Sequence, residues 1–199
     1  MTFRIEEKFR IDKKQLFLFK IWLENNNAKK LFPRREITSI YFDNENKQMY
    51  KDSIEGVLPR SKIRLRYYNK KSGKTNFEKK ISSVEGRFKI SYQIEKFYDH
   101  LKYGFFDINY GICKPTTEVS YFRDYYLLYD QRITIDSSLK YKRAKFKGSN
   151  FMYDDDKIVV ELKNNTSRHD TSIYSKFEFE RIRFSKYCRS MGMVYKIAY

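Results

Sequence analysis

The stretch Lys62–Tyr68, with the sequence Lys-Ile-Arg-Leu-Arg-Tyr-Tyr, carries residue types that could bind an anion. Side chains of a β-strand point alternately to its two sides. Lys62, Arg64 and Arg66 would therefore share one face of a strand, and the apolar residues between them would share the other. Ammonium and guanidinium groups bind phosphate or carboxylate oxygens. A solvated strand edge is the alternative interpretation, and this strand alone does not decide between the two.

Four further segments show the same alternation of charged and apolar residues. They are Phe3–Ile11, Asn76–Ser82, Arg132–Asp136 and Lys157–Lys163. Their polar faces carry Glu6, Lys8, Glu78, Lys80, Arg132, Asp136, Glu161 and Lys163. An ordinary soluble sheet places varied polar residues on its outer face, whereas nearly all the polar positions here are charged. This pattern favours an antiparallel barrel with a polar lumen, in which the cations converge and bind a polyanion.

The carboxylates on these faces allow two interpretations. Glu6, Glu78 and Glu161 could bind a divalent metal ion that bridges carboxylate and phosphate oxygens. Alternatively, each could only form a salt bridge with a lysine or arginine on a neighbouring strand. Either role fits a basic lumen. Because these acids would repel the phosphate groups of a nucleic acid, no specific nucleic-acid partner is expected.

The helices expected from the sequence would cover the apolar side of this sheet. Asp12 can cap a helix that ends at the Asn25-Asn26-Asn27 turn. A second helix is expected over residues 92–103 and a third over 174–191, each followed by a glycine. Short strands are also expected over 37–42, 87–90 and 118–128. The predicted fold class is α+β: an antiparallel tunnel barrel of about eight strands, covered by helices, with the C-terminal helix at the tunnel mouth.

Composition is consistent with one basic domain. The 199 residues include 42 Lys and Arg against 25 Asp and Glu, a net charge of +17, which favours polyanionic partners. Cys113 and Cys188 are expected to be reduced, and His100 and His169 lack the spacing of a zinc site. The first residues do not form a signal peptide, and no apolar run reaches membrane-spanning length. We therefore expect a single domain, residues 1–199, in the cytoplasm.

Eight short motifs together resemble a known family. In order they are Glu6-Glu7-Lys8, Ser39–Asp43, Arg60–Tyr68, Glu78-Lys79-Lys80, Tyr121-Phe122-Arg123, Arg132–Asp136, Glu161-Leu162-Lys163 and Phe184–Tyr187. This series resembles the VTC domain, the polyphosphate polymerase branch of the triphosphate tunnel metalloenzymes, whose fold is an antiparallel tunnel barrel. The related phosphatase branches carry a fuller Glu-x-Glu-x-Lys motif, and here its first position is Arg4. That departure favours the polymerase branch.

The resemblance implies roles for individual residues. The cations expected to bind the triphosphate and the reacting phosphates are Lys8, Arg64, Arg66, Lys80, Arg123, Arg132 and Lys186. Further contacts to the substrate are expected from Arg60, Lys62, Tyr121, Lys163 and Arg183. Glu161 matches the metal-binding glutamate of the family, with Glu6 and Glu78 as further candidate ligands for Mn²⁺ or Mg²⁺.

The implied reaction transfers the γ-phosphate of ATP to a growing polyphosphate chain. A metal-dependent triphosphatase would use nearly the same residues, with water as the acceptor. A non-catalytic module that binds polyphosphate or RNA is the alternative from another class. The resemblance also leaves open a membrane or regulatory partner protein, and the sequence does not fix the oligomeric state.

Overall fold

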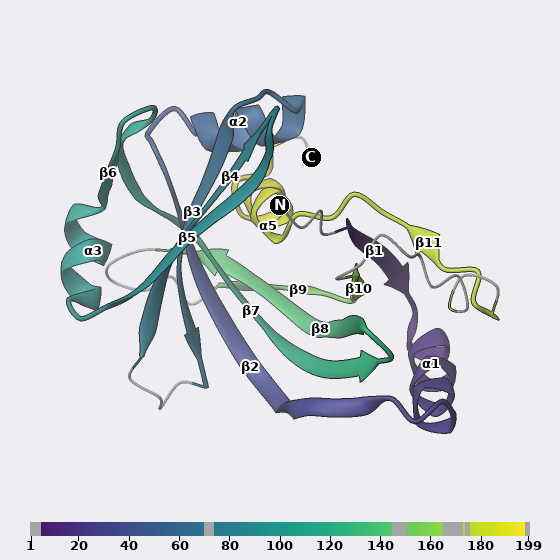
Figure 1. Cartoon of the computed structure of the whole chain (residues 1–199). Helices are drawn as coiled ribbons and strands as arrows, with labels where there is room; N and C mark the ends of the chain where they lie inside the picture. Colours follow the sequence, from purple (N-terminus) through teal and green to yellow (C-terminus); the bar gives the residue numbers. More distant parts are fainter. Residues whose placement is uncertain (1–4, 70–73, 145–150, 165–172, 174–175, 198–199) are drawn as a thin grey trace. The chain divides into compact units, whose positions relative to one another are not determined.

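The computed structural model describes residues 5–69, 74–144, 151–164, 173 and 176–197. The strands are β1 (Ile5–Ile11), β2 (Lys29–Asp43), β3 (Arg60–Tyr68), β4 (Thr75–Ser83), β5 (Gly86–Ile94), β6 (Phe105–Asp107), β7 (Gly111–Leu128), β8 (Gln131–Arg143), β9 (Met152–Asp155), β10 (Ile158–Asn164) and β11 (Glu180–Arg181). The helices are α1 (Lys13–Asn25), α2 (Gln48–Glu55), α3 (Phe97–Tyr103) and α5 (Lys186–Tyr195) (Figure 1).

The strands form one sheet in the order β11-β1-β10-β8-β7-β2-β3-β4-β5, with β6 paired to β7 and β9 to β8. The pairs β1–β10, β10–β8, β2–β3, β3–β4 and β4–β5 are all antiparallel. The predicted fold class, α+β with an antiparallel sheet and helices, is therefore confirmed, although the order of the described strands is open and does not return on itself as in a closed barrel. The order of the strands has β11 and β5 at its two ends. The number of strands is larger than the predicted eight because several short strands show no clear alternation in the sequence.

Close contacts divide the chain into two compact units. Unit 1 comprises residues 1–35, 121–139 and 155–184, and unit 2 comprises residues 36–120, 140–154 and 185–199. The long strands β2, β7 and β8 each contribute residues to both units. That the two units make a single domain stays a prediction.

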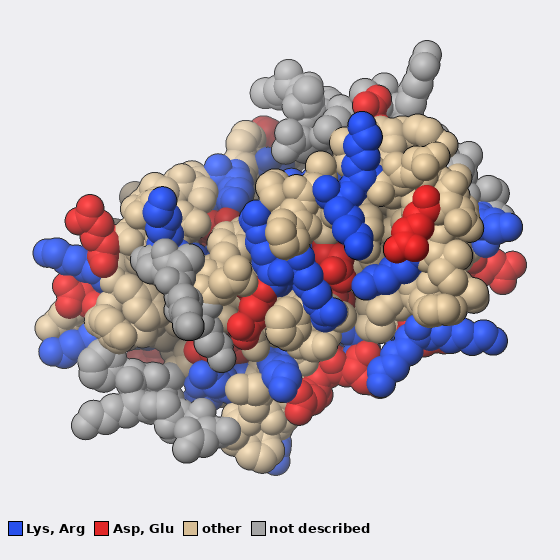
Figure 2. All heavy atoms as spheres, turned by 90° about the horizontal axis from the view of Figure 1, so that it is seen from below, with Lys and Arg blue, Asp and Glu red and all other residues tan. Residues whose placement is uncertain are grey.

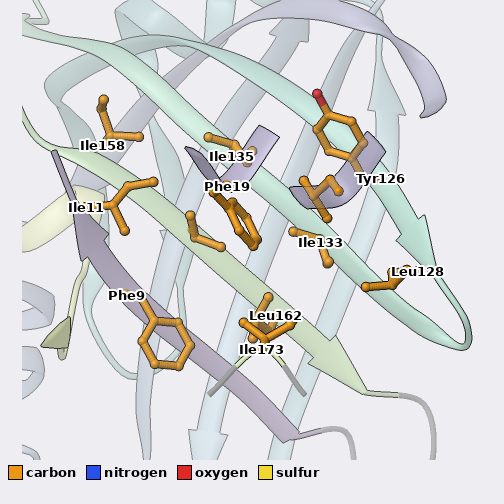
Figure 3. Close-up of a cluster of buried hydrophobic side chains, with 12 residues drawn as sticks. Phe9, Ile11, Phe19, Tyr126, Leu128, Ile133, Ile135, Ile158, Leu162 and Ile173 are labelled. Carbon is orange, nitrogen blue, oxygen red and sulfur yellow. The ribbon is translucent and has the colours of Figure 1, made fainter. Parts of the chain in front are cut away.

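Unit 1 is built around one apolar cluster. Side chains from β1, β10, β8 and β7 lie on one side of these strands, around Phe19 of α1 (Figure 3). The cluster consists of Phe9, Ile11, Phe19, Leu23, Tyr126, Leu128, Ile133, Ile135, Ile158, Val160, Leu162 and Ile173. The alternation of the strands thus buries one face. It leaves Glu6, Lys8, Arg132, Glu161 and Lys163 on the other.

Helix α1 begins where the sequence predicts. The Asp12 carboxylate accepts a hydrogen bond from the Gln15 backbone N–H at 2.7 Å, and the Gln15 side chain accepts one from the Asp12 N–H at 2.9 Å. This reciprocal capping box satisfies two donors at the helix start. Phe19 and Leu23 of α1 are fully buried, which fixes the inner face of the helix.

Unit 2 buries the apolar face of β3 and anchors α5. Ile63 and Leu65 are 1% and 0% exposed, as the alternation predicts. The buried Asp43 carboxylate accepts hydrogen bonds from the Met49 and Tyr50 backbone N–H groups at the start of α2 and from the Tyr187 hydroxyl on α5. One carboxylate therefore connects β2, α2 and α5.

Two of the three predicted helices begin later than expected. Residues Tyr92–Ile94 continue β5, because β5 pairs with β4 along its whole length up to Ile94. The third helix, α5, starts at Lys186, where the Ser185 hydroxyl caps it, and the preceding Glu180–Arg181 pair with β1 as β11. The part predicted as helix over residues 174–175 lies outside the described residues. No helix of the described ranges combines the length and apolarity needed to cross a membrane.

Candidate functional site

In unit 2, three cations surround the buried carboxylate of Glu78. The Arg64 Nε donates to Oε2 of Glu78 at 2.6 Å, and the Lys89 Nζ donates to Oε1 at 2.6 Å. Arg66 Nη1 lies 3.8 Å from the same Oε2. We call these four residues the Glu78 cluster. Its cations outnumber its carboxylate by three to one, so the cluster retains an excess of positive charge that an anion could neutralise.

The charge state of Glu78 follows from these contacts. Burial alone would raise the pKa of this carboxyl group, but attraction to Arg64, Arg66 and Lys89 outweighs it and lowers the pKa to about 2. Glu78 is therefore ionised at neutral pH and holds the guanidinium of Arg64 in one orientation. The Glu78 side chain is only 5% exposed, whereas that of Lys89 is 47% exposed.

Residues of β2 give the two arginines additional hydrogen bonds. Arg64 Nη1 donates to the Tyr41 hydroxyl at 3.1 Å, and Arg66 Nε donates to Ser39 Oγ at 3.2 Å. Tyr41 and Ser39 lie directly opposite Arg64 and Arg66 in the β2–β3 ladder. The Tyr41 ring also stacks on Tyr187 of α5, with centroids 5.1 Å apart. These contacts hold the arginines in place before any ligand binds, which is the preorganisation an anion site requires.

A row of lysines crosses the same face of unit 2. Lys62 on β3 is opposite Lys80 on β4, which is opposite Lys89 on β5. Residues directly opposite each other in an antiparallel pair share a face. Lys62 Nζ donates to Ser185 Oγ at 3.0 Å, at the first turn of α5. Like charges in such a row repel, and a polyanion would relieve that repulsion.

Two other predicted residues of unit 2 have different surroundings. Arg60 Nη1 donates to the Gly56 and Val57 carbonyl oxygens at 3.2 and 3.0 Å. Arg60 thus satisfies carbonyl groups at the C-terminal end of α2, and its contact with the substrate stays a prediction. Lys186 is the first residue of α5 and is half-buried.

In unit 1, two lysines and two glutamates form a second polar cluster. Lys163 Nζ lies 2.7 Å from Oε1 of Glu161 and 3.5 Å from Oε2 of Glu6. Lys8 Nζ lies 3.4 Å from Oε1 of Glu6 and donates to the Phe184 carbonyl oxygen at 2.9 Å. We call Glu6, Lys8, Glu161 and Lys163 the Lys163 cluster. The salt bridges that the sequence left open as an alternative are therefore present.

The Lys163 cluster also offers oxygen atoms that suit a hard divalent cation. The ammonium group of Lys163 lies between two carboxylates, a position that a divalent ion could take. Thr134, opposite Glu161 in the β8–β10 ladder, has a buried Oγ1 with no hydrogen-bond partner among the described residues. Mg²⁺-type ions commonly take one or two protein carboxylates and complete their shell with substrate phosphate oxygens. In the described ranges, no group of three or more His, Cys, Asp and Glu residues could hold a metal ion.

Arg123 is paired more completely than the sequence predicts. Its Nε and Nη2 donate to the two carboxylate oxygens of Asp136 at 2.5 and 2.7 Å. Burial alone would lower the pKa of Arg123. The interactions with Asp136 and Tyr121 outweigh burial and raise this pKa well above its usual value. The Arg123 guanidinium also lies 5.4 Å from the Tyr121 ring centroid. Arg123 is therefore a buried cation whose charge is balanced by Asp136, and its contact with substrate phosphates stays a prediction.

The remaining predicted residues of unit 1 are more exposed. Arg132 is exposed, stands opposite Lys163 in the ladder, and lies 5.9 Å from the ring centroid of Tyr125. Arg183 is also exposed, just after β11. The structure thus brings together Glu6, Lys8, Glu161 and Lys163 in unit 1 and Arg64, Arg66 and Glu78 in unit 2. Their convergence on one lumen stays a prediction. Lys and Arg side chains gather on the face drawn in Figure 2, with Asp and Glu among them.

Sequence reasoning missed Lys89, Tyr41 and Ser39 as members of the Glu78 cluster. The alternation of Arg87 and Lys89 with Phe88 and Ile90 was a signal for Lys89. The roles of Tyr41 and Ser39 depend on the register between β2 and β3, which the sequence does not reveal.

Comparison with known proteins agrees with this geometry at the level of the fold. A candidate adenylate cyclase from Bacillus halodurans has a TM-score of 0.62 at 15% identity, covering 92% of this chain and 94% of that chain. HpAC1 from Hippeastrum, described as a candidate adenylyl cyclase with a dominant triphosphatase activity, has a TM-score of 0.62 at 12% identity, covering 96% of this chain and 97% of that chain. The PH1819 protein from Pyrococcus horikoshii has a TM-score of 0.61 at 14% identity, covering 96% and 99%.

A comparison with curated protein sequences finds no match. The family model of the VTC domain matches residues 3–107 and 102–195, which together include nearly the whole chain and both polar clusters. The chain belongs to the VTC domain family.

Proposed function

We propose that this protein is a polyphosphate polymerase, which transfers the γ-phosphate of ATP to a growing chain of inorganic phosphate. The observation that carries the proposal is the Glu78 cluster. There, two arginines and a lysine surround one ionised carboxylate, and the arginines are oriented by Tyr41 and Ser39. Preoriented guanidinium groups with excess positive charge suit the oxygens of a triphosphate. Membership of the VTC family supports the same substrate class.

In the proposed mechanism, the protein positions reactants and stabilises charge. Arg64, Arg66, Lys62 and Lys80 bind phosphate oxygens and orient the polyphosphate chain for in-line attack. An oxygen of the terminal phosphate attacks the γ-phosphorus, and the bond from that phosphorus to the β–γ bridging oxygen breaks, so that ADP leaves. The attacking oxygen is already anionic, so no general base is needed. Phosphoryl transfer of this kind depends almost entirely on positioning and electrostatics.

A divalent ion would be held by Glu161 and Glu6, with Thr134 Oγ1 as a further oxygen donor. When bound, such an ion would neutralise charge on the phosphate oxygens. Lys163 would then release its carboxylate partners, and its ammonium group could bind phosphate oxygens instead. Lys8, held by the Phe184 carbonyl, would supply a second cation beside the same carboxylates.

A metal-dependent triphosphatase is the second candidate. It is favoured by the fold shared with HpAC1, which is described as having a dominant triphosphatase activity. In that reaction water replaces the phosphate acceptor, and the cations could serve unchanged. The two activities differ in the group that attacks the γ-phosphorus, a phosphate or water. Analysis of the products therefore distinguishes them.

The test is incubation of the full chain with ATP and Mn²⁺ or Mg²⁺, with products resolved by size on a polyacrylamide gel. A polymerase converts the γ-phosphate into an acid-insoluble ladder that an exopolyphosphatase degrades, with ADP formed in equal amount. Release of the γ-phosphate only as orthophosphate would identify the triphosphatase instead. Binding of ATP without any turnover would contradict both enzyme activities.

A further inference from the structure

Helix α1 carries an apolar stripe on the side that faces away from the core of unit 1. Phe17, Leu18 and Ile21 are 64%, 47% and 39% exposed, although Phe19 and Leu23 already supply the buried face. A helix on the surface of a globular protein normally has charged or polar residues opposite its core. The second apolar face therefore indicates a partner other than the core.

Two lysines extend this stripe at the start of the helix. Lys13 and Lys14 are exposed, and the spacing of the helix places them on the same side as Phe17 and Ile21. Cations in the first turn are disfavoured by the helix dipole, and the first turn of α1 holds no acidic residue. These lysines are therefore not explained by the stability of the helix. The region of residues 12–35 contains seven Lys and Arg and two acidic residues, a net charge of +5.

The area of the stripe distinguishes between possible partners. At the exposed fractions given above, the three side chains present on the order of 300 Å² of apolar surface. A stable dimer covers about 800 Å² on each subunit, so the stripe is small for self-association. A membrane surface needs only a short row of apolar side chains that enters the headgroup region, supported by lysines that bind anionic lipids.

We infer that α1 binds the surface of an anionic membrane, with Phe17, Leu18 and Ile21 inserted and Lys13 and Lys14 on the lipid phosphates. This surface lies on the opposite side of β1 and β10 from the Lys163 cluster, since α1 packs on the apolar face of these strands. Lipid binding through α1 is therefore independent of the proposed enzymatic activity.

Sedimentation of the full chain with vesicles tests this inference. The vesicles contain phosphatidylcholine alone or with 30% phosphatidylserine, and excess tripolyphosphate is present to occupy the phosphate-binding cations. We expect binding to the anionic vesicles at least tenfold tighter than to the neutral ones. Phe17→Ser/Ile21→Ser should weaken that binding at least tenfold. Lys13→Gln/Lys14→Gln should weaken it about 30-fold, as follows from about 1 kcal/mol for each lysine near the surface.

Phe106→Ser/Ile108→Ser is the matched control, because these residues of unit 2 are 78% and 85% exposed. If Phe17→Ser/Ile21→Ser and the control Phe106→Ser/Ile108→Ser weaken vesicle binding equally, or if neither variant weakens it, the inference is wrong. Absence of vesicle binding, or a dimer in sedimentation equilibrium that only Phe17→Ser/Ile21→Ser dissociates, would equally overturn it. None of these variants should change ATP affinity, so failure of the lipid inference and failure of the proposed function are distinguishable.

A second measurement does not depend on the serine variants. A fluorophore sensitive to polarity is attached to Phe17→Cys in the full chain, and the same label on Phe106→Cys is the control. Both native cysteines are buried, so labelling at the exposed position is selective. Anionic vesicles should shift the emission to the blue only for the label at position 17. An unchanged spectrum at position 17 would overturn the inference.

Discussion

At the scale of single residues, the most informative feature is that Arg64 is fixed before a substrate binds. Glu78 and Tyr41 together hold its guanidinium group by three nitrogens, at Nε, Nη1 and Nη2. A side chain already held in this way loses little conformational freedom when it binds a phosphate. The Glu78 carboxylate orients Arg64 but neutralises only one of the three cations in the cluster. The cluster therefore keeps a net positive charge that can attract an anion.

Arg64→Ala should weaken the binding of tripolyphosphate by about 2–3 kcal/mol, the scale of charge-assisted hydrogen bonds. Titration calorimetry measures this affinity. Arg87→Ala is the matched control, because Arg87 is an exposed cation of the same unit. If Arg64→Ala binds tripolyphosphate as tightly as Arg87→Ala does, Arg64 is not part of the site.

Glu78→Gln should lower the free energy of unfolding at pH 7 by about 3 kcal/mol, as the displaced pKa of the buried carboxyl implies. A folded-state pKa of about 2, below the ordinary value of 4.5, stabilises the fold fully above pH 4.5. This stabilisation is lost as the pH falls towards 2. Urea denaturation should therefore show a difference from wild type that narrows between pH 5 and pH 3.

The control for that measurement is Glu180→Gln. Glu180 is 54% exposed, and its partner is Arg10 at the surface, so its removal should change stability by less than 1 kcal/mol. A stability difference for Glu78→Gln that stays constant with pH would contradict the ionic role assigned to Glu78.

The residues of the site were predictable in part from alternation. Period-2 patterns correctly separate Ile63 and Leu65 from Arg64 and Arg66, because burial depends on the side of the strand alone. The partners of the arginines were not predictable in the same way. Tyr41 is 23 positions from Arg64, and only the register of the β2–β3 ladder brings them together.

At the scale of elements, helix α5 shows how unit 2 supports its polar face. Its Tyr187 ring stacks on Tyr41, and its Tyr187 hydroxyl donates to the Asp43 carboxylate. Thr117 and Ser190 also share a hydrogen bond of 2.7 Å. Burial and Asp43 raise the pKa of Tyr187 well above its usual value, so the hydroxyl remains a donor at neutral pH.

Tyr187→Phe should destabilise the protein by about 1.5–3 kcal/mol, because it removes a hydrogen bond to a buried charged group. Thermal unfolding followed by circular dichroism measures the effect. Tyr129→Phe, at a side chain that is 70% exposed, should leave the midpoint unchanged. Equal midpoints for the two variants would show that the bond to Asp43 contributes nothing to the anchoring of α5.

The elements themselves were predictable where local signals were strong. Asp12 and the Asn25-Asn26-Asn27 turn define α1, because capping groups act within the helix itself. Helix α2 was missed because its start is capped from a distance: Lys47 at its N-cap makes no side-chain capping bond, and Asp43 accepts the Met49 and Tyr50 N–H groups instead. The late starts of α3 and α5 likewise depend on strand pairing with β4 and β1.

At the scale of the whole molecule, the net charge of +17 predicts a strong dependence of ligand binding on salt. Phosphate ligands release counterions from several cations at once, and screening weakens each contact. The dissociation constant for tripolyphosphate should rise at least tenfold between 50 and 300 mM KCl. A constant that does not change with salt would contradict binding by several cations.

In the proposed reaction, Glu161 serves phosphoryl transfer and is more than a counter-ion for Lys163. The most direct test is the rate of polyphosphate synthesis from ATP by Glu161→Gln as Mn²⁺ is varied, with the surface variant Glu180→Gln as control. We predict that synthesis falls about a hundredfold or more and no longer responds to Mn²⁺, while ATP still binds. Near-normal, Mn²⁺-dependent synthesis by Glu161→Gln would contradict this role of Glu161.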